Sequence, residues 1–205
     1  MALVKLNNNG VKNATAFGSA VTSLGSMVFI KKLTASSSAT LSFVHGSGGV
    51  DFSTYKEYVF TFKNIHAATD NVKFEFNGSV DAGSNYNVVK TTTMIDAYHG
   101  ESGSYGVLQY GGLSLAQSTA FQNLANDQGN ANDENVGGYL HLYNPSSTTF
   151  VKHFTASTSR TSHNDISAQQ HYGGYFNNTA DIDAIRFQFN SGNIDAGDIC
   201  LYGIA

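Results

Sequence analysis

Hydrophobic and polar residues alternate with a period of two along most of the chain, which is typical of β-strands with one buried face. In the run from Tyr58 to Lys63, the side chains of Tyr58, Phe60 and Phe62 point to one side, whereas Thr61 and Lys63 point to the other. The alternation predicts eleven strands, at Met27–Leu33, Ala39–Val44, Glu57–Ile65, Asn71–Asn77, Tyr86–His99, Tyr105–Tyr110, Val136–Tyr143, Thr149–Ser157, Ala168–Phe176, Ile182–Asn190 and Asp198–Ile204.

Short clusters of Gly, Ser, Asn and Asp separate these strands and indicate tight turns. Examples are Gly46–Gly49 and Asp81–Ser84. Many short strands joined by short turns bury their apolar faces by closing into a sandwich or a barrel. We therefore predict an all-β fold, a jelly-roll-like antiparallel β-sandwich that spans residues 27–205.

One segment has a helical pattern instead. In Ser114–Ala125, three apolar residues recur at four-residue spacing, at Ala116, Ala120 and Leu124. The Ser and Thr content of the segment weakens a helix, so a loop is the alternative. The polar stretch Asn126–Asn135 that follows is expected to be a long loop.

Two strand-and-turn segments resemble each other. Lys73–Asn77 precedes Asp81-Ala82-Gly83, and Arg186–Asn190 precedes Asp195-Ala196-Gly197. Either convergent strand chemistry or an internal duplication explains the similarity. A duplication would place two equivalent antiparallel sheets face to face.

The first 26 residues show no sustained period. Their apolar residues are scattered among small and polar ones, so the segment cannot form a core of its own, yet it is too apolar for a plain linker. We expect an extended N-terminal arm that lies on the body or on a neighbouring subunit. Its candidate contact residues are Leu3, Val4, Lys5, Leu6, Val11, Lys12, Phe17 and Val21.

Charge is scarce and unevenly distributed. Only 13% of the 205 residues are charged, about half the usual share, while Asn, Ser and Thr number 20, 22 and 17. The first 50 residues carry four lysines and no acid, and the remainder has a net charge of −8 (7 − 15). This division suggests a basic arm that docks on an acidic body. The dispersed lysines are a poor footprint for nucleic acid, and no apolar run is long enough to span a membrane, so we expect neither partner.

The lone cysteine, Cys200, lies in an alternating apolar run without a neighbouring cation. We expect a buried, unreactive thiol. No apolar segment of the signal-peptide type follows Met1, so synthesis in the cytoplasm is expected.

No catalytic or metal-binding pattern emerges from the sequence, and we expect a protein without enzymatic activity or cofactor. The seven histidines show no His-x-x-x-His spacing, and the serines form no Gly-x-Ser-x-Gly turn. The loop Asn126–Glu134 is rich in oxygen ligands for calcium, but it departs from the EF-hand spacing. A solvated loop is the favoured interpretation, with a calcium site as the alternative.

Tyrosine is the residue most suited to a binding surface. Five tyrosines lie near loops that carry Asn, Gln and His, the side chains of a sugar-binding face or of a protein–protein rim. Packing between strands is the third interpretation. The candidate exposed face consists of Tyr98, Tyr105, Tyr110, Tyr172 and Tyr175.

A resemblance to a known family extends over most of the chain from residue 27 onward. The segments concerned are Met27–Phe43, Tyr55–Phe60, Leu140–Phe154, Ser191–Gly197 and Tyr202–Ile204, and the stretch from Asn144 to Thr148 is the most specific. They resemble virion-associated proteins from tailed phages of marine bacteria, such as cyanophages and phages of abundant ocean heterotrophs.

The resemblance implies a structural or adsorption role in a virion and carries no catalytic residues. We expect a non-catalytic capsid decoration protein on the head surface, which contacts capsid subunits and further copies of itself in a trimer or another homo-oligomer. The alternative is a tail fibre or tail-tip protein that contacts tail subunits and binds a host-surface glycan with a lectin-like face. Either protein would be made in the host cytoplasm and reside in the virion.

Overall fold

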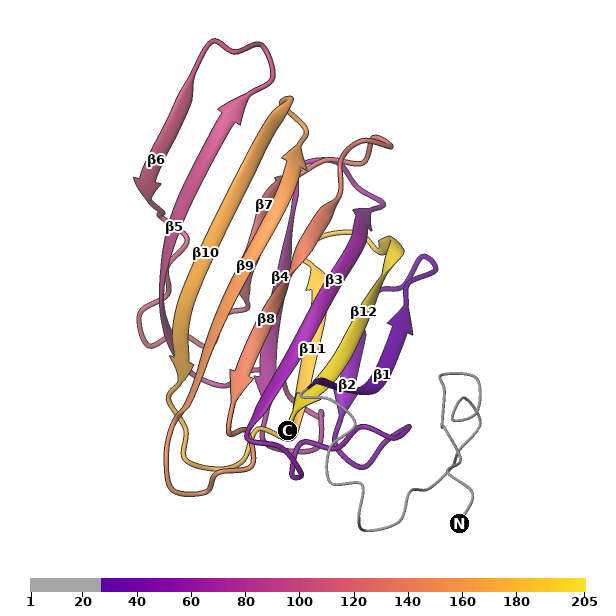
Figure 1. Ribbon diagram of the computed structural model, residues 1–205, viewed down its shortest axis with the longest axis vertical. Helices are drawn as coiled ribbons and strands as arrows, with labels where there is room; N and C mark the ends of the chain where they lie inside the picture. Colours follow the sequence, from indigo (N-terminus) through magenta and orange to yellow (C-terminus); the bar gives the residue numbers. More distant parts are fainter. Residues whose placement is uncertain (1–26) are drawn as a thin grey trace, which may run out of the picture.

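The computed structural model describes residues 27–205, in which every regular element is a β-strand. All strand pairs are antiparallel, and hydrogen bonds connect the twelve strands into one sheet that folds over on itself (Figure 1). The prediction of an all-β, jelly-roll-like antiparallel sandwich is therefore confirmed. The expected arm, with its candidate contacts Leu3, Val4, Lys5, Leu6, Val11, Lys12, Phe17 and Val21, lies outside the described residues.

The larger layer of the sandwich contains eight strands (Figure 1). In spatial order they are β1 (Met27–Thr34), β12 (Ile194–Ile204), β3 (Glu57–Ala67), β8 (Val136–Tyr143), β9 (Lys152–Ser162), β10 (Ile166–Phe176), β5 (Lys90–Gly100) and β6 (Gly106–Tyr110).

The smaller layer contains four strands and lies behind the larger one in Figure 1. Its order is β7 (Gln122–Gln128), β4 (Val72–Ser79), β11 (Ala184–Phe189) and β2 (Leu41–Val44). The two layers are joined where Gln128 of β7 pairs with Ser162 at the end of β9. The apolar faces of the two layers meet and form the core.

All eleven predicted strands are present, with ends that differ by a few residues, but the helix predicted over Ser114–Ala125 is wrong. Two of its backbone N–H groups bond to threonines of β5 instead of to a helical turn, since Leu115 N donates to Thr92 Oγ1 and Gln117 N donates to Thr91 Oγ1, at 2.8 and 3.1 Å. The chain then enters β7, which takes in the first residues of the stretch expected to be a loop.

The similarity between Lys73–Asn77 and Arg186–Asn190 does not reflect two equivalent sheets. These segments belong to β4 and β11, which are neighbouring strands of the smaller layer. Phe76 pairs with Phe187, and Phe74 pairs with Phe189. The two segments are alike because adjacent strands that cover the same core need the same alternation of inward phenylalanine and outward polar residues.

Phe187 occupies the centre of the core between the two layers. Its ring lies 5.2 Å from that of Phe60 and 5.3 Å from that of Phe62 in the larger layer. On the side of the smaller layer, the centroid distances are 6.0 Å to Phe74 and 6.2 Å to Phe76. All five side chains are buried, so this cluster of phenylalanines holds the layers together. Cys200 is also buried, as predicted.

Lys90 is an exception to the apolar interior. Its side chain is fully buried at the start of β5, and Nζ donates hydrogen bonds to the carbonyl oxygens of Val88, at 3.2 Å, and Ala120. Burial lowers the pKa of Lys90 to about 7, and the negative charge of Glu75 partly opposes this shift.

We expect Phe187→Ala to lower the free energy of unfolding by about 3–5 kcal/mol, because the lost ring leaves a cavity between the layers. Phe150→Ala is the control, since Phe150 is 69% exposed, and it should change stability by about 0.5 kcal/mol or less. Urea denaturation of the full chain measures both. Equal losses in the two variants would contradict the central place of Phe187.

Lys90 should make stability depend on pH in the alkaline range. Because the pKa is about 7 in the folded protein and 10.5 ordinarily, the unfolded chain binds more protons between these values, and stability rises with pH across this window. The rise should be up to about 1.4 kcal/mol per pH unit.

Urea denaturation of the wild type and of Lys90→Met at pH 7, 8, 9 and 10 measures this effect. The methionine variant leaves two carbonyl groups unpaired, which lowers stability equally at every pH. The difference between the proteins should therefore grow with pH, and parallel pH profiles would disprove the assignment.

Candidate functional site

The two layers differ in width, and the wider one extends beyond the other at the end formed by β5 and β6 (Figure 1). The nearest strand of the smaller layer is β7, which is joined to β9 and not to β5 or β6. The inward faces of β5 and β6 are therefore not paired with an opposing sheet, as they would be in the middle of the sandwich. This end of the molecule is the place where a cleft can form.

Strand register places a row of polar residues on this inward face. Gln109, Asp96, Gln170 and Thr158 are direct neighbours across β6, β5, β10 and β9. The next inward row toward the core is apolar. Across β5, β10, β9 and β8 it consists of Met94, Tyr172, Ala156 and Leu140. The cleft thus begins where the inward row of the same strands changes from apolar to polar.

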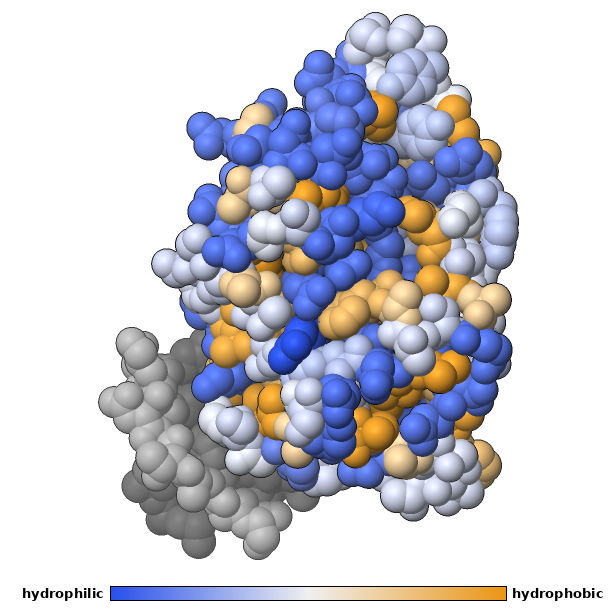
Figure 2. Space-filling model, turned by 180° about the vertical axis from the view of Figure 1, so that it is seen from behind, coloured by the Kyte–Doolittle hydropathy of each residue, from blue (hydrophilic) through white to orange (hydrophobic). Residues whose placement is uncertain are grey.

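Two adjacent hollows of about 270 Å³ each form this cleft, and they share Asp96, Gln109 and Asn126. We call the two hollows together the polar cleft. The first is also lined by Tyr98, Tyr105, Asp127, Arg160 and Ile166, and the second by Met94, Gly111, Gly112 and Leu113. Viewed from the side of the smaller layer, hydrophilic residues dominate the upper part of the molecule, whereas the outer edge where β5 and β6 lie also carries intermediate and hydrophobic residues (Figure 2).

Asn126 of β7 connects the polar groups of the two layers. Its Oδ1 accepts hydrogen bonds from Arg160 Nη2 at 3.1 Å and from Gln170 Nε2 at 2.5 Å. Its Nδ2 donates to Asp127 Oδ2 at 2.5 Å, and that carboxylate lies 3.8 Å from Arg160 Nη2. These bonds fix the guanidinium group at the bottom of the cleft.

Several polar atoms of the cleft are buried without a partner. Asp96, Arg160 and Gln170 are 6%, 5% and 0% exposed. Among residues 27–205, no protein atom bonds to Asp96 Oδ1, Gln170 Oε1, or Nε and Nη1 of Arg160. A buried polar group without a hydrogen bond costs about 1–3 kcal/mol. Such a concentration at one place calls for a functional explanation.

Burial and the neighbouring carboxylates shift the pKa values of two side chains at the cleft, Arg160 and Tyr172. Burial lowers the pKa of Arg160, while the carboxylates of Asp127 and Asp96 act in the opposite direction. Burial and then the charge of Asp96 raise the pKa of Tyr172. The phenol therefore remains protonated and donates to Asn123 Oδ1 at 3.3 Å. One guanidinium between two carboxylates leaves the cleft with an excess of negative charge.

The five candidate tyrosines do not form one face. Tyr98 and Tyr105 line the polar cleft, with ring centroids 6.2 Å apart. Tyr110 and Tyr175 belong to the opposite, outer face of the larger layer, because they share rows with Ile95 and Thr91. The prediction that Tyr172 is exposed is wrong, because its side chain points inward from β10 and is only 3% exposed.

Asn126 and Glu134 of the candidate calcium loop are already engaged within the protein. Besides the bonds of Asn126, Glu134 Oε2 accepts a hydrogen bond from Ala131 N at 2.7 Å. Within the described part of the chain, no three His, Cys, Asp or Glu side chains gather as a metal site would require. The bonds of Asn126 and Glu134 stabilise the loop itself.

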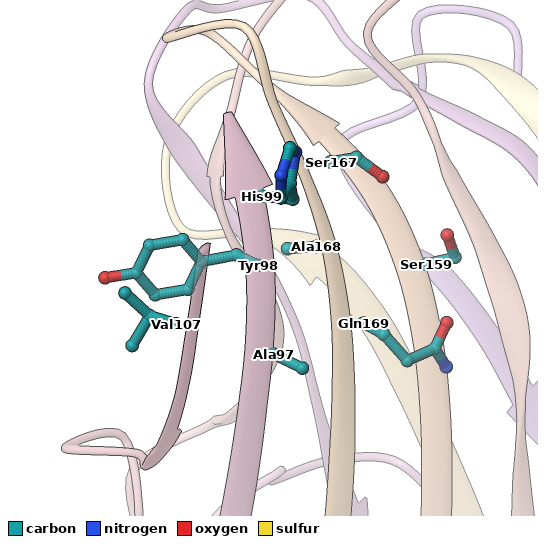
Figure 3. A pocket seen from close by; sticks show the side chains of 8 residues that line it. All are labelled: Ala97, Tyr98, His99, Val107, Ser159, Ser167, Ala168 and Gln169. Carbon is teal, nitrogen blue, oxygen red and sulfur yellow. The ribbon is translucent and has the colours of Figure 1, made fainter. Parts of the chain in front are cut away.

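Apart from the polar cleft, a hollow of about 280 Å³ lies on the outer face of β5, β10 and β9 (Figure 3). It forms because small side chains occupy neighbouring positions, including Ala97, Ser159 and Ser167. Tyr98 also borders it, but its ring points to the side of β5 away from Ala97 (Figure 3). The buried unpaired atoms of Asp96, Arg160 and Gln170 belong to rows of the inner face, so the polar cleft is the stronger candidate.

Sequence reasoning missed Asp96, Arg160 and Gln170, and it considered Asn126 only as part of a candidate calcium loop. A signal for the first three was present, because each interrupts the inward apolar positions of its strand. Asp96 lies between Met94 and Tyr98, Gln170 lies between Ala168 and Tyr172, and Arg160 continues the inward series of Phe154 and Ala156. Asn126 gave no such signal, since β7 itself was not predicted.

Comparison with known proteins adds no further identification, because no family model, no curated protein and no solved structure matches the chain. Residues 27–205 contain no helix long and apolar enough to cross a membrane.

We expect Asn126→Ala to lower the free energy of unfolding by about 1–3 kcal/mol, because it leaves Arg160 Nη2 and Gln170 Nε2 without an acceptor. Asn130→Ala is the matched control, since Asn130 is exposed in the loop that follows β7. It should change stability by about 0.5 kcal/mol or less. Thermal or urea denaturation tests this. If both substitutions cost the same, Asn126 does not organise the cleft.

Proposed function

We propose that the protein is a non-catalytic structural protein of a tailed-phage virion, a decoration protein of the capsid head that assembles with further copies of itself. The virion role rests on the resemblance, and one observation carries the assembly part of the proposal, namely an exposed apolar patch beside the free edge of β6. We define this edge patch as Ile95, Leu108 and Tyr110. It lies on the outer face of the larger layer, away from the polar cleft.

The edge patch is contiguous and well exposed. Ile95 pairs directly with Tyr110, and Leu108 lies two residues before Tyr110 on the same face of β6. The three residues are 51%, 75% and 70% exposed. Large apolar side chains that gather on a surface mark sites of association.

The backbone of β6 supports the same conclusion. Among the described residues, β6 pairs only with β5, so its other edge presents unpaired N–H and C=O groups. Natural edge strands are usually protected by charged residues or proline, and β6 contains neither. An apolar, uncharged edge strand is a template for pairing with another chain, and we assign that position to a second copy.

The resemblance to virion proteins fits this arrangement. Its segments contribute to β1, β12, β3, β8 and β9, which are consecutive neighbours in the larger layer, and to β2 of the smaller layer. The part in the larger layer is continuous and starts at β1, the edge opposite to the edge patch. A sandwich body suits attachment to a head surface, whereas an adsorption fibre carries an elongated segment.

Leu108→Lys should weaken self-association at least about tenfold, because a charge in the contact must be desolvated on assembly. Phe150→Lys is the matched control, since Phe150 is 69% exposed in the loop between β8 and β9, away from the edge patch. Light scattering coupled to size-exclusion chromatography of the full chain measures the oligomer. A monomeric wild type, or an unchanged oligomer in Leu108→Lys, would overturn the assembly proposal.

Immunogold labelling of purified virions tests where the protein lies in the particle. Antibodies against the chain should label the head. Labelling confined to the tail would overturn decoration in favour of an adsorption role, and particles without label would overturn the virion assignment as a whole.

A further inference from the structure

We propose that the polar cleft binds a neutral saccharide. The cleft lies between the inward faces of β5, β6 and β10 and the edge of β7, and its polar side chains come from both layers. Together its two hollows reach the size range of small-molecule sites. The donors and acceptors of the lining, the charge balance and the aromatic residues each point to the same ligand class.

The residues that line the cleft include both donors and acceptors. Arg160 is a donor, Asp96 is an acceptor, and the amide of Gln109 can be either. The unpaired atoms of Arg160 and Asp96 lie beneath this lining, and Gln170 lies behind it. A phosphate or carboxylate ligand could serve only the donors, and an ammonium ligand only the acceptors. Hydroxyl groups both donate and accept, so a polyhydroxylated ligand matches the mixed set.

The charges of the cleft residues favour the binding of neutral sugars over acidic ones. The carboxylates of Asp96 and Asp127 both act on Arg160, and Asp127 lies 3.8 Å from its guanidinium. The positive charge is thus already balanced, and the second carboxylate would repel an anion. An acidic sugar is disfavoured by this arrangement, whereas a neutral sugar carries no charge to repel.

Aromatic rings border the polar groups. Tyr98 and Tyr105 line the same hollow as Asp96 and Arg160, and their rings meet edge to face. The backbone at Gly100 lets Tyr105 take this position, because a Cβ there would lie 2.9 Å from the ring of Tyr105. Phenol rings combine an apolar surface with a polar tip, which suits a sugar that presents C–H groups beside hydroxyls.

This inference does not depend on the proposed function. Leu108 and Tyr110 point to the outer face of β6, whereas Gln109 between them points into the cleft. Self-association through the edge patch and binding in the cleft therefore use opposite faces of one strand. Leu108→Lys should keep saccharide binding, so failure of assembly and failure of binding are distinguishable.

Saturation-transfer NMR and titration calorimetry on the full chain test the proposal. The probes are neutral sugars (glucose, galactose, mannose, N-acetylglucosamine and their short oligomers) and acidic sugars (galacturonate and N-acetylneuraminate). At least one neutral sugar should bind, galacturonate should bind more weakly than galactose, and N-acetylneuraminate should bind more weakly than the best neutral sugar.

Variants at exposed positions of the cleft locate the site without disturbing the core. Tyr105→Ala and Gln109→Ala should each weaken binding about tenfold, which corresponds to the loss of one good contact. Tyr139→Ala is the matched control for Tyr105, because the two side chains are 45% and 43% exposed and Tyr139 lies on the outer face of β8. Its affinity should stay within about twofold of the wild type.

Asp96→Asn tests the charge argument separately. Removing one carboxylate should narrow the difference in affinity between acidic and neutral sugars. The proposal is overturned if no neutral sugar of the panel binds, if Tyr105→Ala and Gln109→Ala leave binding unchanged, or if acidic sugars bind best. The first of these results would assign the polar cleft a hydrated, purely structural role.

Discussion

Contact between the phenylalanines of two unequal sheets is the interaction on which the rest of the structure depends. Phe187 and Phe74 of the smaller layer pack against Phe60 and Phe62 of the larger one. The core forms only where both layers are present, and the larger layer has eight strands against four. The strands that extend past this contact, β5 and β6, are therefore free to carry surfaces that a closed sandwich would bury.

The two faces of these extended strands differ because side chains alternate along a strand. Inward positions such as Asp96 and Gln109 belong to the polar cleft, while outward positions such as Ile95 and Leu108 form the edge patch. One short hairpin thus contributes to both proposed surfaces, the saccharide site and the assembly surface. The chain achieves this with little charge, since amides and hydroxyls fill most polar positions.

The sequence predicted the strands well, because period-two alternation reports directly which face is buried. It could not predict the pairing of distant strands, and the cleft depends on that pairing: Arg160 of β9 meets Asn126 of β7 only because the sheet folds over on itself. Gln122–Gln128 escaped prediction because both faces of β7 are largely buried and four of its residues are amides, so the apolar alternation is lost. Tyr172 was misplaced because loops nearby in sequence do not reveal on which face a strand residue lies.

An experimental structure of the assembled full chain tests most directly the claim that the overhang formed by β5 and β6 is the functional part of the molecule. Electron cryomicroscopy of the oligomer should show a neighbouring copy on the free edge of β6, in contact with Leu108 and Tyr110. The polar cleft on the opposite face should remain open to solvent. An assembly that leaves the edge of β6 uncovered, or that fills the cleft with a neighbouring subunit, would contradict this account.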